Sequence, residues 1–84
     1  MPRYGCSASA SDRAWERYGL IPTAQDWTRA AGDIIEVVAG SGCSAVLLSR
    51  QDMAERWLVR IAGVPVLAIW SPDLAQFVTL LTPP

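Results

Sequence analysis

The sequence predicts an α+β fold in which two N-terminal helices pack on one face of a four-stranded antiparallel β-sheet, in the order ααββββ. Two observations lead to this fold class. Apolar residues recur at helical spacing in the first half of the chain, and the pattern changes to the two-residue period of strands in the second half. Helices on one side of an antiparallel sheet form a common two-layer architecture. With 84 residues, we expect one domain over 1–84, in which residues 1–8 form a flexible arm.

The first helix is predicted over 11–18. Ser11 can cap its N-terminus, because a serine hydroxyl accepts a hydrogen bond from a free amide of the first turn. Gly19 can end the helix, since glycine readily adopts the left-handed conformation found at helix C-termini. We expect Trp15 and Tyr18 to anchor this short helix to the core.

The second helix has the strongest sequence signal. Thr23 and Asp26 form a variant of the capping box at its start, and Gly40 and Gly42 end it. Six apolar residues between them share one face at helical spacing: Trp27, Ala30, Ala31, Ile34, Ile35 and Val38. This face is expected to pack against the sheet.

Four strands are predicted after the helices, over 43–49, 56–62, 65–70 and 75–82. Gly63 allows a tight hairpin between the second and third strands, and Pro72 marks a turn before the fourth. In the second strand, the alternating residues Trp57, Val59 and Ile61 would face the helices.

The opposite face of the predicted sheet is unusually apolar. Leu58, Leu67 and Ile69 would point away from the helices, and Val78 and Leu80 could join them. A sheet covered on one side normally carries polar residues on the other, and apolar patches on monomers are usually limited in size. This face is therefore predicted to bind a partner or a second copy of the chain. Alternatively, the helices wrap further around the sheet, or the strand register is shifted.

Composition excludes several kinds of chemistry. The chain has no histidine, the commonest general base, and all seven of its basic residues are arginines. It contains no phosphate-binding glycine motif and no nucleophile elbow. We therefore expect no catalytic residue, no cofactor and no metal site. Because the net charge is −1, nucleic acid is not expected to be the main partner.

The apolar runs and the cysteines point to a cytoplasmic protein that does not enter a membrane. No apolar run reaches 18 residues, and the chain does not begin with a signal-peptide pattern. Cys6 and Cys43 form no C-x-x-C pair and are predicted to be reduced thiols, with a disulfide between them as the alternative.

Four arginines form two pairs with four-residue spacing. Arg13 and Arg17 lie on the first helix, and Arg56 and Arg60 lie on the second strand. If that helix packs near that strand, the guanidinium groups could converge on an anion such as a phosphate backbone. Alternatively, they pair with four acidic residues nearby in the sequence: Asp12, Glu16, Asp52 and Glu55. The candidate partner-binding residues are Arg13, Arg17, Arg56, Leu58, Arg60, Leu67 and Ile69.

Short segments of the chain resemble a group of small phage and prophage proteins. "SDRAWERYG" (11–19) resembles the S-x-H-A-x-x-R opening helix of that group, and "QFVTLLTPP" (76–84) is similar to its "IVTVLPP" final strand. The W-L-V-R-I-x-G and V-L-A-I-W-S-P segments also fit. The group looks like the compact RelE/BrnT-type toxins, with helices followed by an antiparallel sheet. Two departures are that Arg13 stands where the pattern has histidine, and that this chain is acidic whereas such toxins are strongly basic.

The resemblance implies the toxin scaffold without its catalytic equipment. It suggests a non-catalytic phage-type protein that inhibits a host defence complex by occupying its surface, as anti-CRISPR proteins do. Its partner would be a protein in the host cytoplasm, such as a CRISPR effector complex, and a homodimer is also considered. The alternative is a RelE/BrnT-like ribonuclease toxin, in which the four arginines bind phosphate and Tyr18 or Glu16 moves protons. A structural or regulatory homo-oligomer is a third hypothesis.

Overall fold

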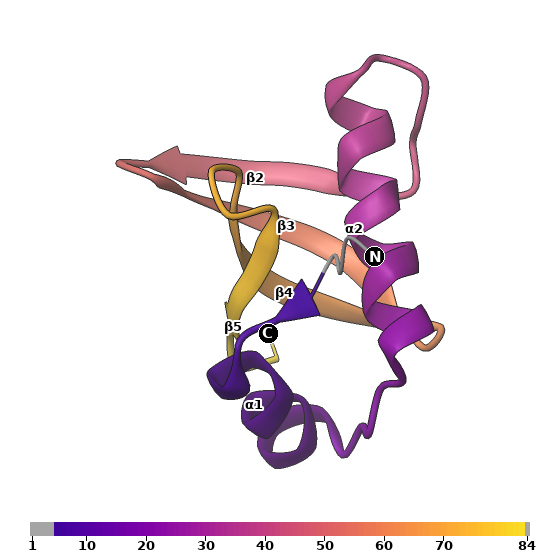
Figure 1. The fold of residues 1–84 in the computed structure, drawn as a ribbon, viewed down its shortest axis with the longest axis vertical. Coiled ribbons are helices and arrows are strands. Elements are labelled where there is room, and N and C mark those ends of the chain that lie inside the picture. Colours follow the sequence, from indigo (N-terminus) through magenta and orange to yellow (C-terminus); the bar gives the residue numbers. More distant parts are fainter. Residues whose placement is uncertain (1–4, 84) are drawn as a thin grey trace.

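The computed structural model describes residues 5–83 and confirms the α+β fold class (Figure 1). Two helices precede the antiparallel strands: α1 (Ala8–Tyr18) and α2 (Ala24–Val38). The antiparallel strands are β2 (Val46–Gln51), β3 (Ala54–Ile61), β4 (Val64–Ser71) and β5 (Gln76–Leu80). Each of these strands pairs with the next one along the chain, so they form a meander.

A short additional strand, β1 (Gly5–Cys6), pairs in parallel with β5. The order of strands in the sheet is therefore β1-β5-β4-β3-β2. The flexible arm predicted over 1–8 lies partly outside the described residues, which begin at residue 5. Residues 5–8 of that segment form β1, the N-cap of α1 and the first residue of that helix. A strand of two residues has no periodicity that the sequence could reveal.

Helix α1 begins earlier than predicted. Ser7, not Ser11, is its N-cap, and the Ser7 hydroxyl accepts a hydrogen bond from the Ala10 amide at 3.1 Å. Ser7 also joins the helix to the sheet, because its amide donates to the Phe77 carbonyl at 2.9 Å and its hydroxyl donates to the Val78 carbonyl. The tertiary contact therefore decides which of the two serines caps the helix.

The buried side of α1 consists of Ala10 and Ala14, whereas Trp15 is 61% exposed. The prediction that Trp15 anchors the helix was wrong, because the two alanines, four residues apart, set the buried side. Tyr18 is partly buried and does hold the helix to the sheet. Gly19 ends α1 in the left-handed conformation, as predicted.

Helix α2 starts with the predicted capping box. The Thr23 hydroxyl accepts from the Asp26 amide at 3.1 Å, and the Asp26 carboxylate accepts from the Thr23 amide at 2.8 Å. The residues of α2 that reach the core are Trp27, Ala30, Ala31 and Ile34. Ile35 and Val38 are exposed, so the buried face of the helix is narrower than predicted.

Three aromatic side chains form the centre of the core. Phe77 of β5 lies between Trp27 of α2 and Trp70 of β4, at centroid distances of 5.6 Å and 4.9 Å respectively. Trp70 meets Phe77 edge-on, which is a favourable arrangement for two aromatic rings. The packing of these rings joins α2 to the middle of the sheet.

Strand β3 alternates as predicted, with Trp57, Val59 and Ile61 buried on the face of the sheet that α2 covers. The buried residues of β4 likewise include the predicted Val66, Ala68 and Trp70.

Strand β5 departs from simple alternation. Ile69 of β4 pairs with Thr79, and the next residue, Trp70, pairs with Phe77. Val78 has no partner on β4 and forms a β-bulge. Leu80 is consequently buried, whereas unbroken alternation had placed it on the opposite face. Leu81, which alternation had placed inside, is only partly buried.

Strand β2 is shifted toward the C-terminus relative to the prediction. It covers 46–51 rather than 43–49, and Asp52 and Met53 form a two-residue turn into β3. All six of its residues are exposed, because β2 forms one edge of the sheet and neither helix covers it.

The β3–β4 hairpin provides a test of local strain. Ala62 and Gly63 connect the strands with φ angles of 53° and 80°, as in a type I′ turn. The left-handed conformation costs an alanine about 1 kcal/mol, whereas asparagine tolerates it. Ala62→Asn should therefore raise the free energy of unfolding by about 0.5–1 kcal/mol in urea titrations. The control is Ala39→Asn, at an exposed residue with φ −74°, which should bring no gain. An equal gain from both variants would contradict the strain argument.

Candidate functional site

An apolar stripe crosses the sheet on the face opposite α2, which we call the outer face. The strand register places Leu58 of β3 opposite Leu67 of β4, and Val46 of β2 opposite Leu58. Ile69 lies two residues along β4 from Leu67, on the same face. Leu58 is 37% exposed, and Leu67 and Ile69 are partly exposed. None of these side chains belongs to the buried core, so the stripe is open to a partner.

The outer face is hollowed near the β2–β3 turn. A concavity of about 530 Å³ lies there, and its lining includes Arg56, Ile69, Leu74 and Val78. Leu74 is highly exposed and extends the apolar stripe beyond the strands. The sequence interpretation missed Leu74 because it read 71–74 only as a turn, although an apolar residue in a turn was an available signal.

Arg56 and Arg60 lie on the outer face on either side of Leu58, and both are exposed. Neither forms an ion pair with another residue in the described part of the chain. Glu55, one of the acids expected to pair with them, instead accepts a hydrogen bond from the Arg50 Nε at 2.9 Å. The apolar stripe is thus flanked by two arginines whose charges are available to a partner.

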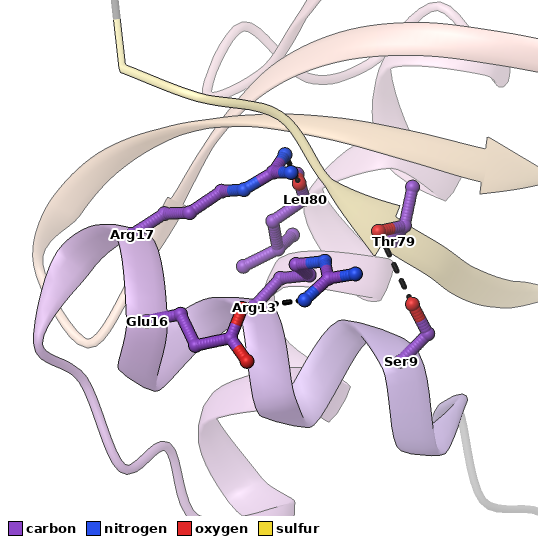
Figure 2. Close-up of polar contacts among 6 residues, drawn as sticks. All are labelled: Ser9, Arg13, Glu16, Arg17, Thr79 and Leu80. Carbon is purple, nitrogen blue, oxygen red and sulfur yellow. Dashed lines mark hydrogen bonds and ion pairs between the residues drawn. The ribbon is translucent and has the colours of Figure 1, made fainter.

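The other two arginines are far from this face. Helix α1 packs beside β5, and β4 separates β5 from β3, so the four guanidinium groups do not converge as the sequence had suggested. Figure 2 shows that Arg13 pairs with Glu16 on the same helix and that Arg17 reaches the sheet. The Arg17 Nη1 donates to the Leu80 carbonyl at 2.7 Å. Arg13 and Arg17 therefore contribute to the helix and its contact with β5.

Tyr18 links the middle of β4 to the residue that follows β5. The Leu81 amide donates to the Leu67 carbonyl at 2.8 Å. In a regular antiparallel pair the Leu67 amide would donate to the Leu81 carbonyl in return, but here the Tyr18 hydroxyl lies between these two groups and relays the hydrogen bond. The Leu67 amide donates to the Tyr18 hydroxyl at 3.2 Å, and that hydroxyl donates to the Leu81 carbonyl at 2.8 Å. Helix α1 thereby fixes the backbone of Leu67, a residue of the outer face.

A second concavity, of about 510 Å³, lies between α2 and the β2–β3 and β4–β5 connections. Glu55, at its edge, is only 5% exposed, and its carboxylate accepts hydrogen bonds from Arg50 and from the Trp57 Nε1 at 3.1 Å. Every buried side-chain polar atom in the described residues has a partner. The Glu55 carboxylate therefore has its hydrogen bonds within the fold, to Arg50 and Trp57, and we assign it a structural role.

Residues 5–83 contain no group of three or more metal-ligating side chains close enough to bind an ion. Cys6 and Cys43 are both free, so the alternative of a disulfide between them was wrong. In the same part of the chain, neither helix is long and apolar enough to span a bilayer.

Comparisons with known proteins found no matching family model, no matching curated protein and no matching solved structure. The resemblance to small phage proteins with a toxin-like scaffold is thus a hypothesis that rests on the short sequence segments quoted above.

The Tyr18 relay predicts a specific loss of stability. Tyr18→Phe removes the hydroxyl and leaves the Leu67 amide and the Leu81 carbonyl without their partner. The free energy of unfolding should fall by about 1–3 kcal/mol, the cost of unsatisfied polar groups, in chemical denaturation. Trp15→Phe, on the exposed side of the same helix, should change it by less than about 0.5 kcal/mol. Equal effects of the two variants would show that the relay has no special role.

The two cysteines should react at different rates. Burial raises the pKa of the Cys6 thiol, and a backbone hydrogen bond that lowers the pKa only partly offsets this. A raised pKa leaves less reactive thiolate at a given pH, whereas Cys43 is exposed. Labelling with a thiol reagent at mildly alkaline pH should thus modify Cys43 first, as mass spectrometry of peptides can show. Faster labelling of Cys6 would contradict its burial beside β5.

Proposed function

We propose that this chain is a non-catalytic binding protein that docks its outer face on a partner protein. The observation that carries the proposal is the apolar stripe of Leu58, Leu67 and Ile69, which neither helix covers and which Arg56 and Arg60 flank. Large uncovered apolar patches are characteristic of interaction sites.

The side chains of the outer face indicate which kind of partner surface would bind it. The aliphatic stripe favours an apolar patch on the partner, since burying each such side chain is worth roughly 1.5–3 kcal/mol before the costs of association. Arg56 and Arg60 favour carboxylates around that patch, because guanidinium groups bind carboxylates in bidentate geometry. The stripe lies on paired strands, so little conformational freedom is lost on docking.

The resemblance to small phage proteins adds a candidate class of partner. Under this proposal the chain acts in the host cytoplasm as an inhibitor of a defence complex, and a CRISPR effector complex is the first partner to test. The ribonuclease alternative receives less support, because its four phosphate-binding arginines lie in two separate places. Growth arrest on induced expression, relieved by Arg60→Ala, would favour the ribonuclease instead.

Leu58→Asp is expected to abolish partner binding while leaving the fold intact. Leu58 is partly exposed, so the change should lower the free energy of unfolding by only about 1 kcal/mol. A charge at the centre of the stripe should weaken binding to reconstituted CRISPR effector complexes at least about tenfold. Biolayer interferometry and a target-DNA cleavage assay measure the two effects, and circular dichroism melts report the fold.

Two further variants separate binding from folding. Ile21→Asp introduces the same charge at a residue that is 83% exposed in the loop between the helices, and it should bind like the wild type. Trp57→Asp places a charge in the core and should unfold the domain. The docking proposal fails if Leu58→Asp melts as severely as Trp57→Asp, or if it binds like Ile21→Asp. If the wild type does not bind CRISPR effector complexes, these complexes are excluded as the partner.

A further inference from the structure

We infer that β2 is the contact strand of a homodimer, in which two copies of the chain pair their β2 strands antiparallel about a two-fold axis. This inference concerns the edge of the sheet rather than its outer face. It does not depend on the proposed function.

The first observation is that β2 has an unpaired backbone edge. It is the last strand in the sheet order and pairs only with β3 in the described part of the chain. Figure 1 shows β2 at one border of the sheet, and its six residues are all exposed. The amide and carbonyl groups along such an edge form a template for a further strand.

The opposite edge of the sheet is protected. Beyond β5 lie β1 and α1, and the carbonyls of β5 accept hydrogen bonds from them. Ser7 donates to Phe77 and Val78, and Arg17 donates to Leu80. Figure 2 shows α1 alongside this strand. The fold therefore closes one edge of the sheet and leaves the other open.

The second observation is the character of the side chains on β2. Val46, Leu47 and Leu48 are 51%, 40% and 51% exposed and follow one another in the sequence. Edge strands usually carry lysine, proline or unpaired charges that prevent association. Here the strand contains neither lysine nor proline, and its one charged residue, Arg50, is paired with Glu55. The bulge between Leu47 and Ser49 is a feature of β2 that opposes association.

A second copy of the chain fits this edge because antiparallel pairing about a two-fold axis matches a strand with itself. With the axis at Leu47, Val46 of each copy lies opposite Leu48 of the other, so aliphatic side chains meet and Arg50 lies away from the centre. The chain has a net charge of −1, so repulsion between copies is small.

The size of the contact sets its strength. With the axis at Leu47, only residues 46–48 of the two β2 strands lie opposite each other, so the pair contributes about two to four backbone hydrogen bonds. It buries much less than the roughly 800 Å² per partner that is typical of stable interfaces. We therefore expect a weak, reversible dimer with a Kd of about 10–100 µM.

Sedimentation velocity from about 1 µM to about 1 mM tests this inference. The samples contain a reducing agent, because Cys43 is exposed and could cross-link copies. The wild type should change from monomer to dimer over this range. Leu48→Lys should raise the Kd at least about tenfold, whereas the control Ile21→Lys should not change it.

Hydrogen exchange identifies the contact directly. Amides within 46–48 should become more protected as the wild-type concentration rises, and Leu48→Lys should remove this increase. The inference is overturned if the wild type stays monomeric, if both lysine variants weaken the dimer equally, or if the new protection appears elsewhere in the chain. Leu58→Asp should still dimerise, so this test and the test of partner binding can fail independently.

Discussion

The packing of Phe77 between Trp27 and Trp70 is the contact on which the rest of the fold depends. It joins α2 to β5 and β4, and Phe77 is fully buried. A chain of 84 residues buries a smaller fraction of its surface than a larger domain does. This chain concentrates its large aromatic core residues on the face of the sheet that α2 covers, whereas α1 lies along the edge at β5. The outer face consequently receives no cover of its own.

Helix α1 protects the edge of the sheet rather than adding bulk to the core. Ala10 and Ala14 are small enough to bring the helix close to β5. Ser7, Arg17 and Tyr18 can then donate hydrogen bonds to carbonyls of β5 and the residue that follows it. Unsatisfied carbonyls at a buried edge would be costly. The arginine-rich helix "SDRAWERYG" is thus explained in part by the hydrogen-bonding needs of its neighbouring strand.

The features that the sequence predicted are those that local patterns encode. The capping box of α2 and the alternation of β3 depend on neighbouring residues, and the placement of Leu58, Leu67 and Ile69 on one face follows from that alternation.

The features that the sequence did not reveal depend on contacts between distant residues. Pairing of β1 with β5 and the choice of Ser7 over Ser11 are tertiary effects. The bulge at Val78 reverses the side on which Leu80 lies, which no count of alternating residues could show. The alternative in which the four arginines converge required α1 to lie beside β3, and that placement also depends on tertiary contacts.

The two proposed contact surfaces would reinforce each other. Antiparallel pairing of two β2 strands would continue one five-stranded sheet into the other, and a two-fold axis perpendicular to the sheet keeps both outer faces on the same side. A dimer would therefore present two apolar stripes to the same partner assembly. When both stripes can bind at once, the second contact forms at a high effective concentration, so a weak dimer can convert modest binding into strong binding. This coupling suits a partner with repeated subunits, in which neighbouring copies offer the same surface twice.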